Sequence, residues 1–172
     1  MRIFFIDQMA MYSAYHTDRR NQLTHYIGVP SIVFSLFILL SWVSLMQVGD
    51  ITVTAAMIFL AVILIFYLLS DFLIGVIAAL IYIPLLYLAD YLFPLPSPEG
   101  WGTFAVLFIG GWVFQLWGHV YEGRKPALLD NLFQIFMAPA FLIAEVLFSL
   151  GGCQRLKAQI QGRMTKYTAT GR

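Results

Sequence analysis

Three histidines, His16, His25 and His119, are the side chains of this sequence best suited to chemistry. Imidazole is the commonest metal ligand in proteins, and three imidazoles from different elements could together hold one metal ion. His16 and His25 are nine residues apart, which places them on opposite sides of a straight helix because each residue turns by about 100°. Both can bind one metal only if the chain turns between them. Residues 17–21, "TDRRN", supply that turn, and Asn21 is the expected N-cap of the next helix.

A glutamate accompanies the third histidine. Glu122 follows His119 by three residues, so the two side chains share one face of a helix. Paired glutamate and histidine ligands in helix bundles use this spacing in the reverse order. Glu122 could bind a metal directly, hydrogen-bond a ligating imidazole, or pair with Arg124 or Lys125 instead. We expect it to support the ligands or to act as a weak ligand.

The composition indicates an all-α integral membrane protein. Hydrophobic residues make up 60% of the 172 residues and charged residues only 11%, with a mean hydropathy of +0.81. A soluble domain of this size has too much surface to cover with so few charges. The net charge of +1, without a basic patch interleaved with aromatic residues, argues against nucleic acid as a partner. The single cysteine, Cys153, excludes an intrachain disulfide and a multi-cysteine metal site.

Four apolar segments are long enough to be predicted transmembrane helices. A span needs about 20 apolar residues. The last segment is slightly short unless its polar end lies at the membrane interface. The predicted spans are 27–46, 51–70, 72–93 and 103–118.

The first 26 residues are expected to form an interfacial segment. They do not resemble a signal peptide, because Asp7 and Gln8 interrupt the apolar stretch. The spacing of Ile3, Ile6, Met9 or Ala10, and Ser13 predicts an amphipathic helix that lies along the membrane surface.

The basic residues predict the orientation. Cytoplasmic loops are enriched in Lys and Arg. Such residues precede the first span, follow the fourth and populate the tail 153–172, whereas the loops "QVGD" and "PLPSPEG" contain none. Both termini are therefore expected in the cytoplasm. This topology brings all three histidines to the cytoplasmic membrane face, although more than ninety residues separate His25 from His119.

Residues 126–152 are apolar enough for a fifth span, but a fifth span would carry the basic tail outside. The segment also contains Asp130, Asn131, Gln134 and Glu145, which are costly against lipid. We therefore predict a re-entrant hairpin of two half-helices broken near Pro139, buried against protein. Asp130 and Asn131 could cap the first half-helix or take part in chemistry. The three histidines could also be ordinary polar residues at the headgroup level.

Two motif blocks carry a resemblance to a known family. The segments "YHTDRRNQLTHYIGVP" (15–30) and "GWVFQLWGHVYEGRKPALLDNLFQIFMAPAFLIAE" (111–145) closely resemble the Mpo1-like family. The shared pattern is Tyr-His, then Asn and His followed by Gly-x-Pro. Downstream come Gln-x-x-Gly-His, a glutamate, a basic pair, Pro-Ala-Leu and Asp-Asn. The middle spans match only as apolar segments.

The resemblance implies an Fe(II)-dependent dioxygenase that uses O2 to shorten 2-hydroxy fatty acids by one carbon. His16, His25 and His119 match the family's histidines and are the expected iron ligands. In yeast-like members an additional histidine stands where this chain has Thr17, and the glutamate lies one residue further from its histidine. This departure argues against a ligand set of four or more histidines. The candidate catalytic residues are His16, His25, His119 and Glu122. The candidate substrate-binding or supporting residues are Tyr15, Asn21, Arg124, Lys125, Asp130 and Asn131.

Other functions are open to the same sequence. A small transporter is disfavoured because the spans carry almost no buried charge and no inverted repeat. A non-catalytic membrane scaffold would leave the histidines incidental. A di-iron desaturase or hydroxylase needs many more than three histidines. We expect one domain over residues 1–172 in a bacterial inner membrane, with the active site on the cytoplasmic side, or in the endoplasmic reticulum if the source is eukaryotic.

Overall fold

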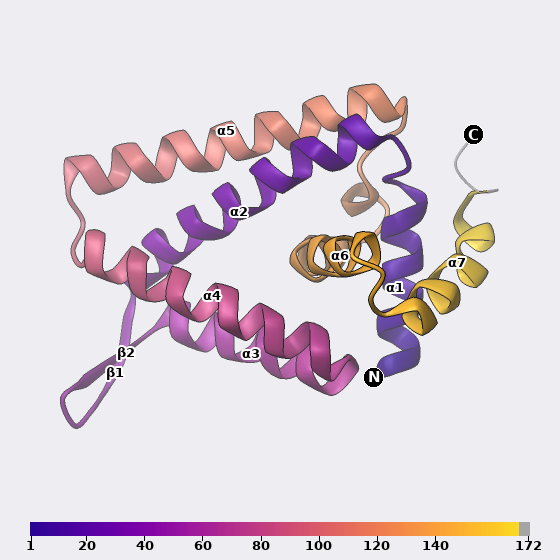
Figure 1. The fold of residues 1–172 in the computed structure, drawn as a ribbon. Helices are drawn as coiled ribbons and strands as arrows, with labels where there is room; N and C mark the ends of the chain where they lie inside the picture. The colour runs from indigo at the N-terminus through magenta and orange to yellow at the C-terminus, as the bar shows by residue number, and fades with distance from the viewer. Residues whose placement is uncertain (169–172) are drawn as a thin grey trace.

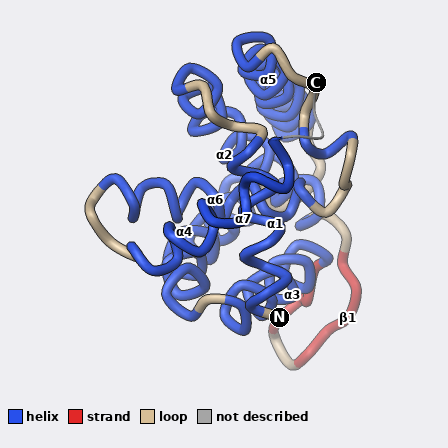
Figure 2. Tube along the Cα trace, turned by 90° about the vertical axis from the view of Figure 1, so that its right-hand side faces the viewer, coloured by secondary structure: helices blue, strands red, loops and turns tan. Residues whose placement is uncertain are grey.

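The computed structural model describes residues 1–168, and nearly all of them are helical (Figure 1, Figure 2). A short antiparallel hairpin interrupts the helices, with Val48 opposite Ile51. In chain order the elements are α1 (Arg2–Ala14), α2 (Arg19–Ser41), β1 (Ser44–Val48), β2 (Ile51–Thr54), α3 (Ala55–Ser70), α4 (Phe72–Leu92), α5 (Pro98–Glu122), the 3-10 turn η1 (Ala127–Leu129), α6 (Gln134–Ser149) and α7 (Gln154–Thr168).

Helices α2 to α5 run back and forth between two ends of the molecule (Figure 1). Short polar side chains begin each one by accepting a hydrogen bond from a backbone N–H of the first turn. Asp18 caps α2, Thr54 caps α3, Asp71 caps α4 and Ser97 caps α5. The N-terminus, the start of α2 and the end of α5 lie at one end, and the hairpin and the α4–α5 connection lie at the other.

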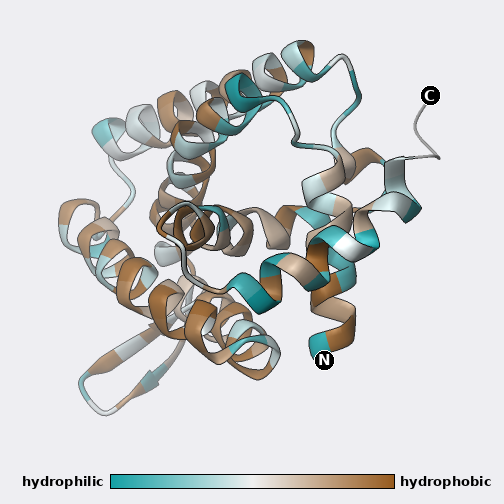
Figure 3. Cartoon of the chain, turned by 45° about the vertical axis from the view of Figure 1, so that its right-hand side comes forward, coloured by the Kyte–Doolittle hydropathy of each residue, from teal (hydrophilic) through white to brown (hydrophobic). Residues whose placement is uncertain are grey.

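Three helices are long and apolar enough to cross a membrane: α2, α4 and α5. Helix α5 has 25 residues, so the fourth predicted span is longer than the apolar segment alone indicated. Helix α3 has 16 residues, or about 24 Å at 1.5 Å per residue, which is shorter than a hydrocarbon core of about 30 Å. Helices α3 and α4 consist mainly of hydrophobic residues (Figure 3), and several of their large apolar side chains are exposed, among them Ile65, Phe72 and Leu80.

The predicted boundary between the first two spans is wrong. Helix α2 ends at Ser41, and residues 44–54 form the hairpin instead of completing two helices. The segment is apolar and β-branched at several positions, as in "ITVT", and such residues pack well in strands. Hydropathy alone cannot distinguish this strand pair from helix ends.

The predicted break at Pro139 is also wrong. Helix α6 runs continuously from Gln134 to Ser149 with Pro139 inside it. The chain bends instead at residues 150–153, where α6 and α7 meet at 118°. Here Gly151 has a φ of 82°, a conformation that glycine adopts without the steric cost that a Cβ would add. The bent pair is compatible with a broken span or a re-entrant segment.

The N-terminal segment forms the expected helix, α1, and it packs inside the protein along much of its length. Phe5, Ile6 and Met9 are buried together with Leu156 and Ile160 of α7. Asp7 accepts a hydrogen bond from the Tyr167 hydroxyl at 2.7 Å and pairs with Arg163 at 3.4 Å and Lys166 at 3.5 Å. Helix α7 therefore holds α1 beside the ends of α2 and α5.

Helices α2 and α5 form the most extensive helix pair, and glycines let them approach closely. A Cβ on Gly118 of α5 would lie 2.2 Å from Thr24 Oγ1 and 2.4 Å from Asn21 Oδ1. A Cβ on Gly28 of α2 would lie 2.4 Å from Gln115 Nε2. Small residues at such crossings bring helix backbones together. The crossing brings His25 of α2 next to His119 of α5.

Candidate metal centre

The three histidines meet, as the predicted topology required. His16 lies in the turn between α1 and α2, His25 in the second turn of α2 and His119 in the last turn of α5. The three rings each offer one nitrogen within 4.8 Å of the others. The Nε2 atoms of His16 and His25 are 3.0 Å apart. The turn over residues 15–18 reverses the chain between these two histidines, which confirms the geometric requirement derived from their spacing.

Backbone carbonyls define the protonation of two of these rings. His16 Nδ1 lies 2.7 Å from the carbonyl of Tyr12, and His25 Nδ1 lies 2.8 Å from the carbonyl of Asn21. A carbonyl only accepts hydrogen bonds, so each Nδ1 carries a proton and donates it. In neutral rings both Nε2 atoms then present lone pairs to each other across 3.0 Å. A cation between the two nitrogens would turn this repulsion into ligation.

Burial keeps the cluster uncharged. His16, His25 and His119 are 3%, 2% and 8% exposed. Desolvation lowers the pKa of His16 well below its usual value, and the neighbouring His25 and His119 add to the effect. Tyr12 stacks on the His16 ring at 4.0 Å. Neutral imidazoles are the form that binds metals, and His119 Nδ1 has no hydrogen-bond partner among residues 1–168.

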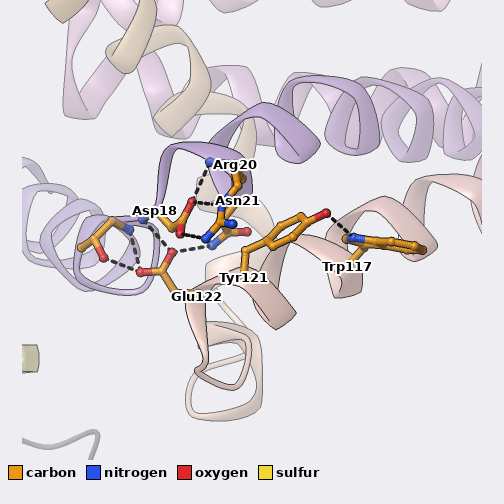
Figure 4. A network of polar contacts seen from close by, with 7 residues as sticks. Asp18, Arg20, Asn21, Trp117, Tyr121 and Glu122 are labelled. Carbon is orange, nitrogen blue, oxygen red and sulfur yellow. Dashed lines mark hydrogen bonds and ion pairs between the residues drawn. The ribbon is translucent and has the colours of Figure 1, made fainter.

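Glu122 supports the turn that carries His16 (Figure 4). One carboxylate oxygen accepts from the backbone N–H of Thr17 at 2.9 Å and from the Thr17 hydroxyl. The other accepts from the Asp18 N–H at 2.9 Å and Asn21 Nδ2 at 3.0 Å. Glu122 therefore joins the end of α5 to the α1–α2 turn. It lies outside the group of possible ligands found among the described residues.

Glu122 does not pair with Arg124 or Lys125, the two cations nearest to it in sequence. Lys125 pairs with Asp130 at 2.5 Å. Arg124 donates to the carbonyls of Ala14 at 3.0 Å and Tyr167 at 2.8 Å. Both cations thus point toward α1, η1 and α7, while Glu122 turns toward α2.

Asn21 does not cap α2, contrary to the expectation from sequence. Asp18 takes that position, and its side chain accepts from the Arg20 N–H at 2.8 Å. Asn21 is fully buried inside the first turn of α2. Its side chain donates to Glu122, and its carbonyl accepts from His25. Asn21 therefore connects the supporting carboxylate to a histidine.

Four of the other candidates form a separate group beside the centre. The Tyr15 hydroxyl donates to Asp130 at 2.6 Å, and the Arg124 guanidinium lies 3.6 Å from the Tyr15 ring centroid. Lys125 completes the group through Asp130. Asn131 accepts from the Phe133 N–H at 3.0 Å and donates to Gln8 at 2.7 Å. Asn131 thus helps to begin α6, and this group fastens α1 to the segment after α5.

An apolar cavity opens from the histidines. It is lined mainly by side chains of α2, α3, α5 and α6, with Tyr82 of α4. All three histidines line it, and apolar residues such as Leu36, Leu60 and Phe136 form most of the remaining wall. A mostly apolar wall with a few convergent polar groups is typical of sites that bind small molecules.

Sequence reasoning missed several residues around the centre. Tyr12 stacks on His16. Thr17 donates a hydrogen bond to Glu122, although from the sequence it was notable only because yeast-like members have a histidine at this position. Gln115 and Gln134 line the cavity and are buried. Gln115 is the first residue of the Gln-x-x-Gly-His motif, and its position one helical turn before His119 is the signal that could have given it a role at the centre. Gln134 offers no such signal, because its neighbour Gln8 is remote in sequence.

Apolar helices around a buried histidine triad define a membrane-associated helical protein with a candidate metal centre. A family model described as 2-hydroxy-palmitic acid dioxygenase Mpo1-like matches residues 4–150. A relative from Saccharomyces cerevisiae, 2-hydroxy-palmitic acid dioxygenase MPO1, is 36% identical over 156 residues, covering 90% of this chain and 86% of the yeast protein. No solved structure matches the chain. The chain belongs to the Mpo1-like family, as its motifs indicated.

Proposed function

We propose that this protein is an Fe(II)-dependent dioxygenase that uses O2 to shorten 2-hydroxy fatty acids by one carbon. The observation that carries the proposal is the triad of buried histidines at the polar end of an apolar cavity. The name of the yeast relative supports both the dioxygenase class and a 2-hydroxy fatty acid as substrate.

The residues of the triad suit iron. Imidazole is a favourable ligand for iron, and a three-residue site leaves positions open for other ligands. His16 and His25 present unprotonated Nε2 atoms, and the carbonyls of Tyr12 and Asn21 hold the two rings in place. Bound iron would supply redox chemistry with O2 and open positions for the hydroxyl and carboxylate of the substrate. His16, His25 and His119 are the proposed iron ligands.

The cavity suits the alkyl chain of a fatty acid. Its wall is apolar along α2, α3 and α6, and the only titratable groups on it besides the histidines are three tyrosines, among the residues that the structure describes. Burial of a methylene group contributes about 0.8 kcal/mol. The cavity therefore suits the alkyl chain, with the polar head at the buried histidines.

The remaining candidates position this centre. Glu122 holds the turn of His16 and, through Asn21, the carbonyl that orients His25. Tyr15, Arg124, Lys125 and Asp130 fasten α1 to the segment after α5, so we assign them to support of the centre. Asn131 belongs with this support through its bond to Gln8.

We place the protein in a bacterial inner membrane with four helices, α2 to α5, between its two faces; α3 is shorter than the hydrocarbon core, so the bilayer would thin around it. Helix α1 lies at the cytoplasmic face, and the bent pair α6–α7 enters and leaves on that side. The basic residues at the end of the molecule with the histidines favour this orientation, since Lys and Arg accumulate in cytoplasmic segments. Substrate would reach the centre from the bilayer.

The test is a product assay on protein purified without oxygen. The detergent-solubilised protein is loaded with Fe(II), mixed with 2-hydroxypalmitic acid and O2, and its products are separated by mass. We expect a product one carbon shorter and O2 consumption that depends on iron. A scaffold or transporter would bind no stoichiometric iron and consume no O2, and that outcome would refute the proposal.

A further inference from the structure

An unpartnered amide lies in the apolar cavity close to the histidines. Gln115 is 8% exposed, and its Nε2 has no hydrogen-bond partner among residues 1–168. A buried donor without an acceptor destabilises a folded protein. Such a group therefore calls for an acceptor from outside the chain.

The position of Gln115 relates it to the metal centre. It precedes His119 by four residues, so both side chains lie on one face of α5, about 6 Å apart along the axis. Both side chains line the same cavity. The Gln115 amide fits against α2 because residue 28 is a glycine: a Cβ at Gly28 would lie 2.4 Å from Gln115 Nε2.

No group of residues 1–168 accepts a hydrogen bond from the Gln115 amide. Ile32, Leu36 and Trp112, which line the same cavity, carry no acceptor oxygen in their side chains. The other buried cavity amide differs, because Gln134 Nε2 already donates to Gln8 Oε1 at 2.6 Å. An alkyl chain has no acceptor, so in a bound fatty acid only the polar head can accept a hydrogen bond from Gln115 Nε2.

We propose that Gln115 Nε2 donates a hydrogen bond to an oxygen of the 2-hydroxy acid head group bound beside His119. This inference rests on the proposed function, since that function supplies the head group. The bond makes Gln115 a substrate-binding residue that sets the head against the histidines. Hydrogen bonds to charged groups are stronger than neutral ones, and their loss weakens binding about tenfold or more.

The experiment measures equilibrium binding of radiolabelled 2-hydroxypalmitic acid to the Fe(II) protein without O2, so that no turnover occurs. Gln115→Met keeps the size of the side chain and removes the donor. We expect the Kd to rise about tenfold or more while the Tm of the ligand-free protein stays equal or rises, because an unsatisfied buried donor is gone. Gln115→Glu, a second variant of equal size without the donor, should weaken binding further. Gln159→Met, on the exposed face of α7, is the matched control and should bind as the wild type does.

Palmitic acid in the same assay identifies the oxygen. Equal losses with both acids assign the carboxylate, and a loss confined to the 2-hydroxy acid assigns the hydroxyl. A Kd within twofold of wild type in the folded Gln115 variants would overturn the inference. Failure of the wild-type protein to bind iron or either acid would instead refute the proposed function, so the two failures are distinguishable.

Discussion

Replacing Glu122 by glutamine tests whether the carboxylate at the end of α5 holds the metal centre together. The carboxylate accepts four hydrogen bonds: two from Thr17, one from the Asp18 N–H and one from Asn21. A glutamine side chain has one acceptor oxygen, and its NH2 group would face two donors. In either orientation of the amide, the variant loses the two hydrogen bonds that one of the carboxylate oxygens accepts in the wild type.

The size of the effect follows from those two bonds. A hydrogen bond to a charged group contributes about 1.5–3 kcal/mol when buried. Thr17 is exposed and Glu122 half-buried, so we expect the two lost bonds to cost about 2 kcal/mol in all, which corresponds to about 30-fold in an equilibrium constant. Because the bonds hold His16 and Asn21, much of this cost falls on iron binding. A supporting carboxylate in a metal site typically changes affinity or activity by about 10–100-fold.

The assay compares iron affinity, turnover and thermal unfolding of wild type and Glu122→Gln. We expect the variant to fold and to lose at least about tenfold in iron affinity or turnover. Thr17→Val in a double-mutant cycle should give a smaller loss on the Glu122→Gln background than on wild type, since the two residues share bonds. Glu99→Gln, at the far end of α5 in its first turn, is the matched control. Wild-type iron content and turnover in Glu122→Gln would show that the carboxylate belongs only to a solvated face and has no role in the metal centre.

Three further predictions concern the helix crossing, the α1–α7 contact and the topology. Gly118→Ala should lower the free energy of unfolding by about 1–3 kcal/mol and reduce bound iron, because the added Cβ would collide with Thr24 and Asn21. Gly110→Ala is the control: its Cβ would point into open space on the same helix, so iron content and Tm should not fall. The hydrogen bond from Tyr167 lowers the pKa of Asp7 in the folded protein below its ordinary value of 3.8, and Lys166 and Arg163 add to this effect. The contact between α1 and α7 is therefore at full strength above pH 3.8 and weakens as the pH falls through the pKa of Asp7 in the folded protein. Hydrogen exchange of α7 should be independent of pH from about 5 to 8 after correction for intrinsic rates, and faster in Asp7→Asn at neutral pH; equal protection in the variant would contradict this. A cysteine at position 165 in a Cys153→Ser background should react with a membrane-impermeant thiol reagent only after permeabilisation, and labelling of intact cells would contradict a cytoplasmic tail.

The convergence of the histidines was predictable from the sequence because it depends on topology and helix rotation alone. The nine-residue separation of His16 and His25 demanded a turn, and the structure places that turn at residues 15–18. The common face of His119 and Glu122 followed from their spacing. The partners of Glu122 could not be predicted, because Arg124 and Lys125 are its neighbours in sequence. In the fold, Glu122 instead accepts hydrogen bonds from backbone N–H groups of a segment more than a hundred residues away.

Several local features escaped prediction for physical reasons. Asp18 and Asn21 are both good N-cap residues. The sequence does not distinguish them, and only the position of the turn in the folded protein makes Asp18 the N-cap, three residues before Asn21. A proline inside an apolar helix is tolerated where neighbours compensate for the lost backbone bond, so Pro139 gave no reliable sign of a break. The strands of the β1–β2 hairpin are rich in apolar and β-branched residues, and hydropathy therefore assigned most of them to the neighbouring spans and left only "QVGD" as a loop.

The central claim is that three histidines hold one iron. Its most direct test is the metal content of anaerobically purified wild type and of His16→Ala, His25→Ala and His119→Ala, with circular dichroism to show that each variant folds. We expect about one iron per wild-type chain, a large loss of iron in each variant, and no turnover of 2-hydroxypalmitic acid by any of them. Full iron content and activity in a folded His119→Ala protein would remove that residue from the ligands, and a wild-type protein without stoichiometric iron would contradict the account as a whole.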